Sequence, residues 1–376
     1  MAHFIHTADW QIGRQYGQFD DEDAAFLAQA RLDVVATIAQ VATERGVDAV
    51  LVAGDVFDTQ GVSDRTIRRL FAAMAGFSGP WVMIPGNHDA ALVDSVWTRA
   101  QSLGCMGPNV HPMLQPGVFE LPHAGAWVLA APLTQRHTYD DVTAGFDLMD
   151  TPADRVRIGL AHGSVSGQLA ESIDASNPIA PDRASVAKLD YLALGDWHGV
   201  MEIGARTWYS GTPEPDRFRN NESGVVLDVE IDSPGAIPRV TPISVGRYRW
   251  QQWQVRLDLH SDVEALIHKL DGLEASDVLR LELEGTLTVA DWDRLQRALD
   301  QASARVLALR LEASAIVLMP DHEDLAALNV DGYVGVVASE LQTMQQDPNT
   351  GAIAREALRV LMQFQRDATR GVQGGQ

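Results

Sequence analysis

Apolar and polar residues alternate in blocks along the first two hundred residues of the chain. Apolar side chains recur every three or four positions over residues 27–41, which predicts a helix, and Gly46 supplies a stop for it. The apolar run over 49–53 then predicts a buried strand. A second helical face over 67–74 and a second apolar run over 81–84 repeat this order. Strands that alternate with amphipathic helices are typical of an α/β fold.

Further apolar runs predict four more strands, over residues 127–130, 158–161, 191–194 and 225–229. Polar segments that contain proline and glycine separate them. The proline-containing stretch 233–242 predicts a turn or linker. We therefore expect the large domain to cover residues 1–245.

The hydrophobic pattern changes near residue 245. From there the sequence predicts strand, helix, strand, helix and strand in turn, a small α/β unit over 246–328 that could cap the large domain. Residues 329–376 are expected to form a helical, partner-binding tail. Its last helix carries one apolar stripe, made of Ile353, Ala357, Leu361 and Phe364. That stripe either binds a partner or packs on the chain's own small unit.

Composition and charge limit the classes of function. A single cysteine excludes an internal disulfide bridge, so the 376-residue chain tolerates a reducing compartment and we expect it in the cytoplasm. No leader and no segment able to span a bilayer is visible, so no membrane association is expected. The net charge of -22 disfavours a generally basic nucleic-acid surface. It does not exclude DNA, because metal ions neutralise carboxylates and a local patch or a basic partner can contact phosphates.

Polar residues directly follow five of the predicted strands. Asp9 follows the apolar pair Phe4 and Ile5 of a first predicted strand, Asp55 follows the strand 49–53, and the sequence Gly-Asn-His-Asp at 86–89 follows the strand 81–84. His162 and the sequence Gly-Asp-Trp-His at 195–198 follow two later strands. Any one of these clusters is also compatible with a turn or a helix cap. Because ligands of open α/β sheets bind beyond the carboxyl ends of the strands, we expect all five loops to converge on one site.

The residue types at these strand ends select a chemistry. Carboxylate, amide and imidazole ligands together suit divalent ions such as Mn, Fe or Zn, and Mg less well. A carboxylate such as Asp55 can bridge two ions about 3.5–4 Å apart, which activate a water and neutralise phosphoryl oxygens. The sequence therefore predicts a two-metal phosphoesterase.

The same motifs resemble those of the calcineurin-like metallophosphoesterase superfamily. The resemblance narrows to the SbcD-type DNA-repair exonuclease subunits through the sequences at 6–14, 54–58 and 209–213, and it extends over roughly residues 3–230. It implies a sandwich of two mixed β-sheets flanked by helices, a small α/β capping domain and C-terminal helices. Those helices would bind an SbcC-like, SMC-type ATPase. DNA would be the substrate, and a homodimer is left open.

The resemblance also implies a role for each matched ligand residue. Asp9 and His198 would hold one metal ion, Asn87 and His162 the other, and Asp55 would bridge them.

Two residues beside these ligands would serve the reaction itself. His88 would face the scissile phosphate, to stabilise charge or to protonate the leaving oxygen. Asp89 either orients His88 or caps a helix.

Two positions depart from the family's pattern. The motif Asp-x-His reads Asp-Trp-Gln at 9–11, and the motif Gly-His-x-His reads Gly-Asp-Trp-His at 195–198. Gln11 offers a neutral amide oxygen and Asp196 an anionic oxygen, so we expect both as metal ligands in an oxygen-rich site. Such a site favours Mn, with Mg, Fe or Zn as alternatives. Loss of two imidazoles is also compatible with a catalytically weakened site.

These features favour a metal-dependent DNA phosphodiesterase, an exonuclease with endonuclease action left open, that works in DNA repair with the ATPase. A phosphodiesterase for small nucleotides or other organic phosphates is the second hypothesis, since fold kinship does not fix a substrate. A scaffold subunit is the third.

One further segment either contacts a nucleic-acid strand or, as we favour, packs as a linker or edge strand. It contains the basic and aromatic residues Arg247, Tyr248, Arg249, Trp250, Trp253 and Arg256.

Overall fold

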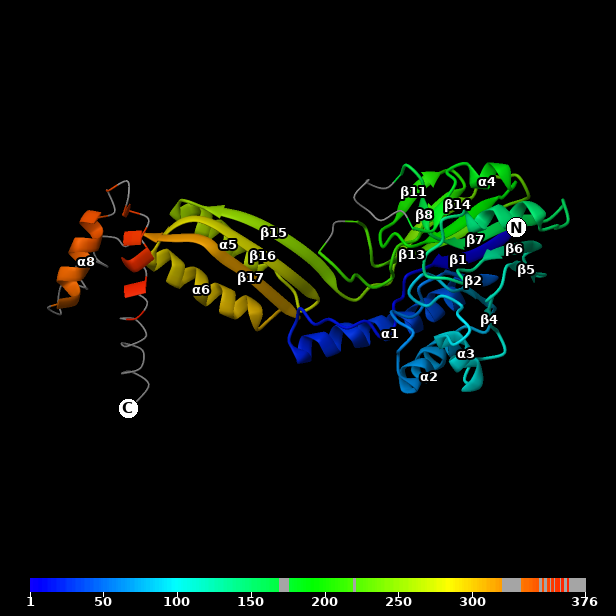
Figure 1. Ribbon diagram of the computed structural model, residues 1–376, viewed down its shortest axis with the longest axis horizontal. Coiled ribbons are helices and arrows are strands. Elements are labelled where there is room, and N and C mark those ends of the chain that lie inside the picture. The colour runs from blue at the N-terminus through cyan, green and yellow to red at the C-terminus, as the bar shows by residue number, and fades with distance from the viewer. Residues whose placement is uncertain are drawn as a thin grey trace. The chain divides into compact units, whose positions relative to one another are not determined.

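The computed structural model describes two compact units of the chain, Met1–Trp250 and Gln251–Gln376 (Figure 1). Their division lies close to the boundary expected near residue 245. The boundary expected at residue 328 lies outside the described residues and stays a prediction. The described residues are 1–168, 176–218, 221–319, 333–344, 347, 350, 351, 353, 354, 356–358, 360, 361 and 364.

The first unit contains two six-stranded sheets, of which the first is built around the N-terminal strand. Its strands are β1 Ala2–Thr7, β2 Ala49–Ala53, β3 Trp81–Ile84, β4 Val110–Pro112, β13 Val225–Ile231 and β14 Arg239–Ser244. Across the sheet they lie in the order β14-β13-β1-β2-β3-β4. Strands β1 to β4 run parallel to one another, and β13 and β14 extend the sheet in antiparallel pairing.

The second sheet has the same size and is also mixed. Its strands are β5 Gly117–Leu121, β6 Ala126–Ala131, β7 Val156–His162, β10 Tyr191–Gly195, β11 Met201–Gly204 and β12 Thr207–Tyr209. They lie in the order β11-β12-β10-β7-β6-β5, with the four inner strands parallel and both edge strands antiparallel. A separate short parallel pair is formed by β8 Ser164–Val165 and β9 Pro178–Ile179.

The two sheets pack face to face. Alternate residues of each strand point to opposite faces of its sheet, and the apolar residues on the inner faces meet in a shared core. Phe4 and Leu51 of the first sheet share one apolar core with Val128 and Leu160 of the second. The outer face of the first sheet is covered by helices α1 Asp21–Arg45, α2 Asp64–Ala73 and α3 Val96–Ser102, and α2 runs on into the 3-10 helix η1 Met74–Gly76. The outer face of the second carries α4 Arg183–Val186 and the 3-10 helix η2 Val142–Leu148. The predicted sandwich of two mixed sheets flanked by helices is confirmed.

Helix α1 is long and apolar enough to cross a membrane by length and composition alone, with a mean hydropathy of 1.3 over its most apolar window. Its apolar side chains, such as Val35 and Ile38, pack instead in the core beneath the first sheet. The fully buried Arg31 of the same helix donates hydrogen bonds to neighbouring loops, including the Trp10 carbonyl at 2.6 Å. These contacts make α1 a core helix of the first unit.

One expectation about the first unit is right only in part. Residues 233–242 were expected to form a turn or linker. Residues 233–238 form a turn, but β14 begins at Arg239, inside that stretch, and pairs with β13. Pro242 has no backbone N–H, so it cannot donate the hydrogen bond that a residue of a central strand gives to a neighbouring strand. β14 tolerates it because this strand is at the edge of the sheet, where one side needs no partner.

The second unit has the predicted order of strand, helix, strand, helix and strand. Its elements are β15 Arg249–Leu257, α5 His260–Asp271, β16 Asp277–Thr288, α6 Val289–Ser303 and β17 Ala308–Met319. The three strands form one sheet in the order β15-β16-β17, and leucines of β16 pack with α5 and α6.

Beyond this sheet, helix α8 Tyr333–Met344 packs with the last helical segment of the chain. Ala338 and Leu358 contact Val289 in a small apolar cluster. The predicted apolar stripe is divided by this packing. Leu361 joins the cluster, whereas Ile353 and Phe364 are 72% and 70% exposed.

Candidate metal centre

The sequence-predicted ligands come together at the carboxyl ends of strands from both sheets. Asp9 follows β1 and Asp55 follows β2, while His162 is the last residue of β7 and Asp196 comes directly after β10. Backbone hydrogen bonds join the first two loops, since the Asp9 N–H donates to the Gly54 carbonyl at 3.0 Å. This is the edge at which open α/β sheets bind ligands.

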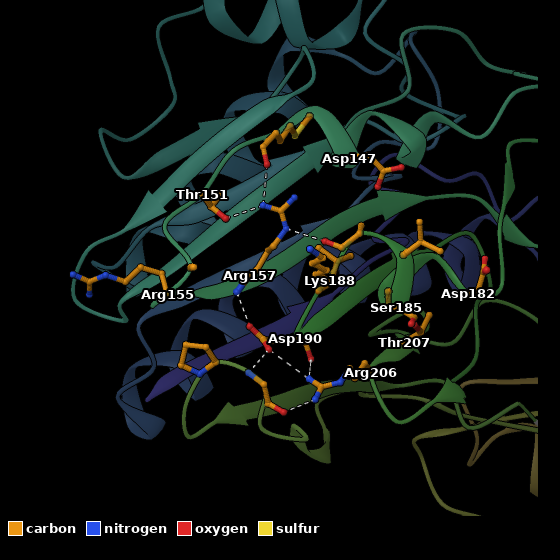
Figure 2. Close-up of a pocket in the computed structure, with 18 of the residues that line it drawn as sticks. Asp147, Thr151, Arg155, Arg157, Asp182, Ser185, Lys188, Asp190, Arg206 and Thr207 are labelled. Carbon is orange, nitrogen blue, oxygen red and sulfur yellow. Dashed lines mark hydrogen bonds and ion pairs between the residues drawn. The ribbon is translucent and has the colours of Figure 1, made fainter.

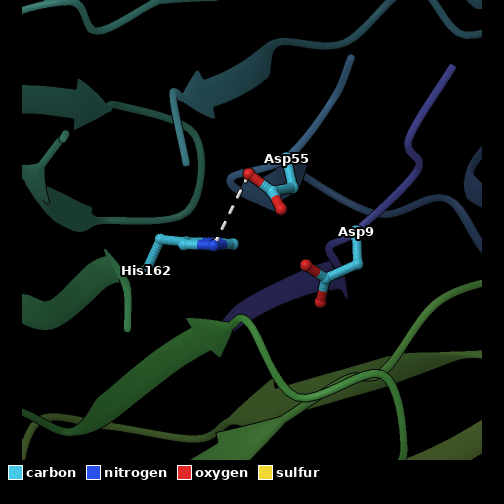
Figure 3. A group of neighbouring side chains, drawn as sticks. All are labelled: Asp9, Asp55 and His162. Carbon is cyan, nitrogen blue, oxygen red and sulfur yellow. Dashed lines mark ion pairs between the residues drawn. The ribbon is translucent and has the colours of Figure 1, made fainter. Parts of the chain in front are cut away.

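His162 is the centre of the group. Its Nδ1 lies 2.8 Å from the Ala53 carbonyl oxygen, so Nδ1 carries the proton and Nε2 is left as the ligand atom. Three oxygens surround Nε2, from Asn87 at 2.9 Å, Asp55 at 3.6 Å and Asp196 at 3.8 Å. Figure 3 shows His162 with Asp55 and with Asp9, which approaches from the other side of Asp55.

The spacing and chemistry of these atoms fit a divalent metal ion. Metal–ligand bonds of about 2.1 Å place neighbouring ligands of one ion about 3–3.5 Å apart. The oxygens around His162 Nε2 are near that separation, and one ligand atom each from Asp9, Asp55 and His162 lies within 4.8 Å of the others. A mixed set of carboxylate, amide and imidazole donors suits Mn, Fe or Zn.

The backbone at the site is held in a conformation that few residues adopt. Asp9, Gln11, Asp55 and Asp196 all have positive φ, between 44° and 106°. Such conformations cost free energy and persist where surrounding contacts impose them, as at functional sites. Their occurrence at four of the seven predicted ligand positions shows that the fold holds these side chains in place.

Two glycines make this close approach possible. A Cβ atom on Gly54 would lie 2.3 Å from His162 Nδ1. A Cβ atom on Gly86 would lie 2.2 Å from an Asp55 carboxylate oxygen. Any larger residue at either position would push a ligand side chain out of the group.

The concentration of carboxylates shifts the pKa values of the group. Burial raises the pKa of Asp9 well above its usual range, and the nearby Asp55 and Asp196 raise it further. Burial also raises the pKa of Asp196. For His162 burial acts to lower the pKa, but the three carboxylates outweigh it and raise the pKa to about 9. The group is therefore short of positive charge, which a proton or a divalent cation can supply.

His198 and Gln11 lie at the side of this group. Burial lowers the pKa of His198, which keeps its imidazole neutral as metal ligation requires. The Gln11 amide nitrogen lies 3.2 Å from His198 Nε2, and the Gln11 amide oxygen accepts a hydrogen bond from Arg14 at 2.6 Å. Only that oxygen can bind a metal ion. The oxygen faces Arg14 and the nitrogen faces His198, so ligation by Gln11 beside His198 requires the amide group to turn over.

Asp216 supports His198 from behind, and sequence reasoning missed it. One of its carboxylate oxygens lies 3.0 Å from His198 Nδ1, and the other accepts from Arg217 at 3.0 Å. Burial acts to raise the pKa of Asp216, but His198, Arg31 and Arg217 outweigh it and hold that pKa well below its usual range. A carboxylate behind a ligating imidazole fixes the ring and strengthens it as a ligand. The only sequence signal was an acidic residue within twenty positions of His198, which is too common to select.

Arg31 joins the loops of both sheets and was also missed. This fully buried side chain donates to the carbonyls of Trp10 at 2.6 Å and Glu214 at 3.1 Å, and its Nη2 lies 3.7 Å from Asp216. One guanidinium thus fixes the Asp9 loop against the loop that supports His198. Arg31 lies in the middle of helix α1, among apolar residues that recur every three or four positions, and nothing in that pattern indicates this role.

His88 and Asp89 are neighbours in sequence with different surroundings. The His88 backbone N–H donates to Asp55 at 2.9 Å, and its ring Nδ1 lies 2.8 Å from the Asp58 carbonyl oxygen. The carboxylate of Asp89 is buried and accepts hydrogen bonds from the backbone N–H groups of Gly86, Val56 and Phe57. In this structure Asp58 orients the His88 ring, and Asp89 fixes the ligand loops to each other.

A cavity of about 1230 Å³ lies elsewhere in the first unit, lined by residues of the η2, α4 and β11–β12 segments (Figure 2). Arg157 is held there by the carbonyls of Phe146, Met149 and Ala187. Arg206 donates likewise to carbonyl oxygens. Since these two guanidinium groups serve neighbouring backbone, the cavity offers no site comparable to the ligand group.

Comparison with known proteins identifies the family of this chain. Residues 2–198 match the model of the calcineurin-like phosphoesterase family, which is more than half of the chain. The chain belongs to this family and is a metal-dependent hydrolase.

Two curated relatives are similar over a longer stretch, and both are named as the D subunit of the nuclease SbcCD. The chain is 29% identical to the protein of Rhodobacter capsulatus over 64% of its own length and 68% of the relative's. It is 27% identical to the protein of Bacillus subtilis over 60% of its length and 65% of the relative's. The crystal structure of TT1561 of Thermus thermophilus aligns with a TM-score of 0.42 and 11% identity, covering 65% of this chain and 99% of that one.

Replacing Asp216 by Asn tests its support of His198. The amide keeps the shape but loses the charge, so we expect the affinity for Mn to fall about 10–100-fold. Isothermal titration of the metal-depleted chain with Mn measures this. Asp228→Asn is the matched control, because Asp228 pairs with His3 at 2.6 Å in the same unit and touches no predicted ligand. Equal Mn affinity in the Asp216 variant and the wild type would show that the carboxylate does not support a ligand.

Metal binding should release protons. Below pH 9 the metal-free His162 carries a proton that a ligating Nε2 must lose, so apparent Mn affinity should rise with pH up to about 9. Titrations with Mn at pH 7 in buffers of different ionisation enthalpy report the number of protons released. A binding heat that is the same in every buffer would contradict this coupling.

Proposed function

We propose that this chain is a nuclease subunit that hydrolyses DNA phosphodiester bonds with two divalent metal ions. The observation that supports this most is the group of donor atoms around His162 Nε2, beside an accessible second histidine. The names of the two curated relatives support a nuclease rather than another phosphoesterase. Exonuclease action on DNA in repair, in the cytoplasm and with an ATPase partner, is part of this proposal; endonuclease action is left open.

The proposal assigns the donors to two metal ions. Asn87, His162 and Asp196 would hold one, Asp9 and His198 the other with Gln11 as a further candidate, and Asp55 would lie between them. When bound, two such ions supply an activated water as nucleophile and neutralise charge on the phosphoryl oxygens. Three carboxylates in one donor set favour a harder ion, so we propose Mn ahead of Mg, Fe or Zn.

His88 is the residue proposed to act on the substrate directly. Its side chain is 41% exposed, in contrast to the buried Asp55 and His162, and its Nε2 lies 4.0 Å from Asp55. Because the Asp58 carbonyl accepts from Nδ1, the free Nε2 faces the ligand group. As an imidazolium, with a proton on Nε2 as well, the ring can donate a hydrogen bond to a phosphoryl oxygen or a proton to the leaving oxygen. Asp89 supports this role indirectly, through the loop it fixes.

The helical end of the second unit is the proposed contact with an SbcC-like, SMC-type ATPase. Tyr333, Val336, Ile353 and Phe364 are each more than 60% exposed there. Apolar side chains on paired helices fit the apolar stripe of a coiled coil. A phosphodiesterase for small nucleotides and a weakened scaffold remain the competing functions, and each predicts a different outcome in the assay below.

The proposed function is tested on single- and double-stranded DNA, cyclic dinucleotides and a chromogenic phosphodiester, with Mn, Mg, Fe or Zn. We expect DNA hydrolysis, fastest with Mn. Asn87→Ala should abolish it by removing a ligand. His88→Gln should lower kcat about 10²–10⁴-fold while metal content is unchanged, because it removes proton transfer alone. His268→Gln on α5 is the control for replacement of a histidine.

The other outcomes identify the competing functions. Hydrolysis confined to cyclic dinucleotides or the chromogenic ester indicates a small-molecule phosphodiesterase. A chain inert with all four metals is a scaffold.

The partner contact is tested by placing charge on the exposed helical face. The double variant Val336→Asp and Ile353→Asp should lose co-purification with the ATPase, since burying two carboxylates in an apolar contact is unfavourable. Hydrolysis of the chromogenic ester should persist. Val93→Asp, at a residue 93% exposed in the first unit, is the control. Retained co-purification in the double variant would place the ATPase contact elsewhere.

A further inference from the structure

A cluster of aromatic rings lies beside the metal centre and takes no part in the chemistry proposed above. We call Phe19, Phe218 and Trp250, together with Tyr16, the aromatic shelf. The ring centroids are 4.8 Å apart for Phe218 and Trp250, 5.5 Å for Phe19 and Trp250, and 6.2 Å for Tyr16 and Trp250. Tyr16 is buried, whereas the other three rings are partly exposed. Aromatic surface therefore remains open in the first unit.

The shelf is tied to the predicted metal ligands on two sides. On one side, the Tyr16 hydroxyl accepts a hydrogen bond from Arg31 at 2.6 Å, and Arg31 holds the carbonyl of Trp10. On the other side, Phe218 follows Arg217 directly in the chain, and the Arg217 guanidinium lies 2.8 Å from His198 Nδ1. A molecule that rests on the shelf is thus next to the loops that carry Asp9 and His198.

Charge around the shelf is distributed unevenly. Arg14 and Arg217 lie on the side of the metal centre, with side chains 24% and 38% exposed. The acidic run over residues 20–23 begins directly after Phe19. A polyanion is attracted at the arginine side and repelled at the acidic side. A phosphate is therefore favoured beside the arginines and disfavoured beside the acidic run, and the partly exposed rings offer a surface to an uncharged, flat group.

We propose that the aromatic shelf stacks an unpaired nucleobase of a single-stranded DNA end whose phosphate enters the metal centre. This inference rests on the proposed nuclease function and specifies its substrate class. Stacking on an aromatic ring suits every base, because each has a π face, and it contributes binding without reading sequence. A base in a blunt duplex must first be unpaired and unstacked, which costs free energy. The shelf consequently selects single-stranded or frayed ends over blunt ones.

The segment of arginine and aromatic residues from 247 to 256 contributes only one residue to this shelf. Tyr248 is buried, and Trp253 packs in the core of the second unit with Lys269 over its ring at 3.8 Å. Arg256 pairs with Asp258. Packing accounts for Tyr248 and Trp253, as favoured from the sequence, and a surface ion pair engages Arg256. Trp250 is the ring that belongs to the shelf.

The test measures stacking separately from cleavage. Full-length, metal-depleted chain in chelator is titrated into single-stranded oligonucleotides that carry 2-aminopurine at one end, and into blunt duplexes. Stacking quenches 2-aminopurine fluorescence. We expect Phe19→Leu and Phe218→Leu to weaken single-strand binding roughly five- to hundredfold and to lose the quenching, with blunt-duplex binding little changed. Phe218→Trp should retain both.

The matched control is Phe26→Leu, at a ring 49% exposed on α1 that joins no aromatic pair among the described residues. Circular dichroism and thermal unfolding confirm that each variant is folded. If both shelf variants bind and quench like Phe26→Leu while the Mn-loaded wild type cleaves DNA, the shelf inference is overturned and the nuclease proposal stands. If the Mn-loaded wild type hydrolyses a small phosphodiester but no DNA, both are overturned.

Discussion

The structure depends on one electrostatic constraint, the crowding of donor oxygens around the buried His162 Nε2. Oxygens of Asn87, Asp55 and Asp196 lie within 4 Å of this nitrogen, and the carboxylate of Asp9 lies close by. Carboxylates at such separations repel one another strongly away from water, and burial penalises the charge of each. The group is stable only with positive charge inside it. A raised pKa at His162 is the response of the protein alone, and divalent ions are the response that produces a hydrolase.

The fold brings these groups together and keeps them there. The two sheets pack face to face and carry their ligand loops at the same end of the strands. Ligand residues that are up to 189 positions apart in sequence, from Asp9 to His198, therefore come together. Backbone strain at Asp9, Gln11, Asp55 and Asp196 is balanced by contacts that would be lost if the loops relaxed. Arg31 and Asp89 supply such contacts by binding loop backbone from within the core. Buried hydrogen bonds beside the site thereby maintain its geometry.

The sequence predicted the parts of this arrangement that follow from short-range pattern. Runs such as 49–53 and 158–161 predict buried strands, and a polar residue directly after such a strand must lie at a sheet edge. The supports behind the ligands follow no such rule. Asp216 and Arg31 are joined to their partners only by the tertiary fold, and their spacing in sequence matches no motif. β14 was missed for a related reason. A strand tolerates a proline at the edge of a sheet, and the sequence alone does not show that this strand lies at an edge.

The two departures from the family's pattern have unequal physical consequences. Asp196 stands 3.8 Å from His162 Nε2, among the donors, so its charge adds directly to the attraction for a cation. The oxygen of Gln11 is bound by Arg14, which itself lies 3.4 Å from Asp216. The set around His162 therefore gains an anionic donor where the family has an imidazole. In the set around His198, the amide of Gln11 stands where the family's motif has an imidazole, and the guanidinium of Arg14 already donates to its oxygen. Two ions in this centre would meet different fields, with the stronger attraction on the His162 side, because charge and free donor oxygens are concentrated there.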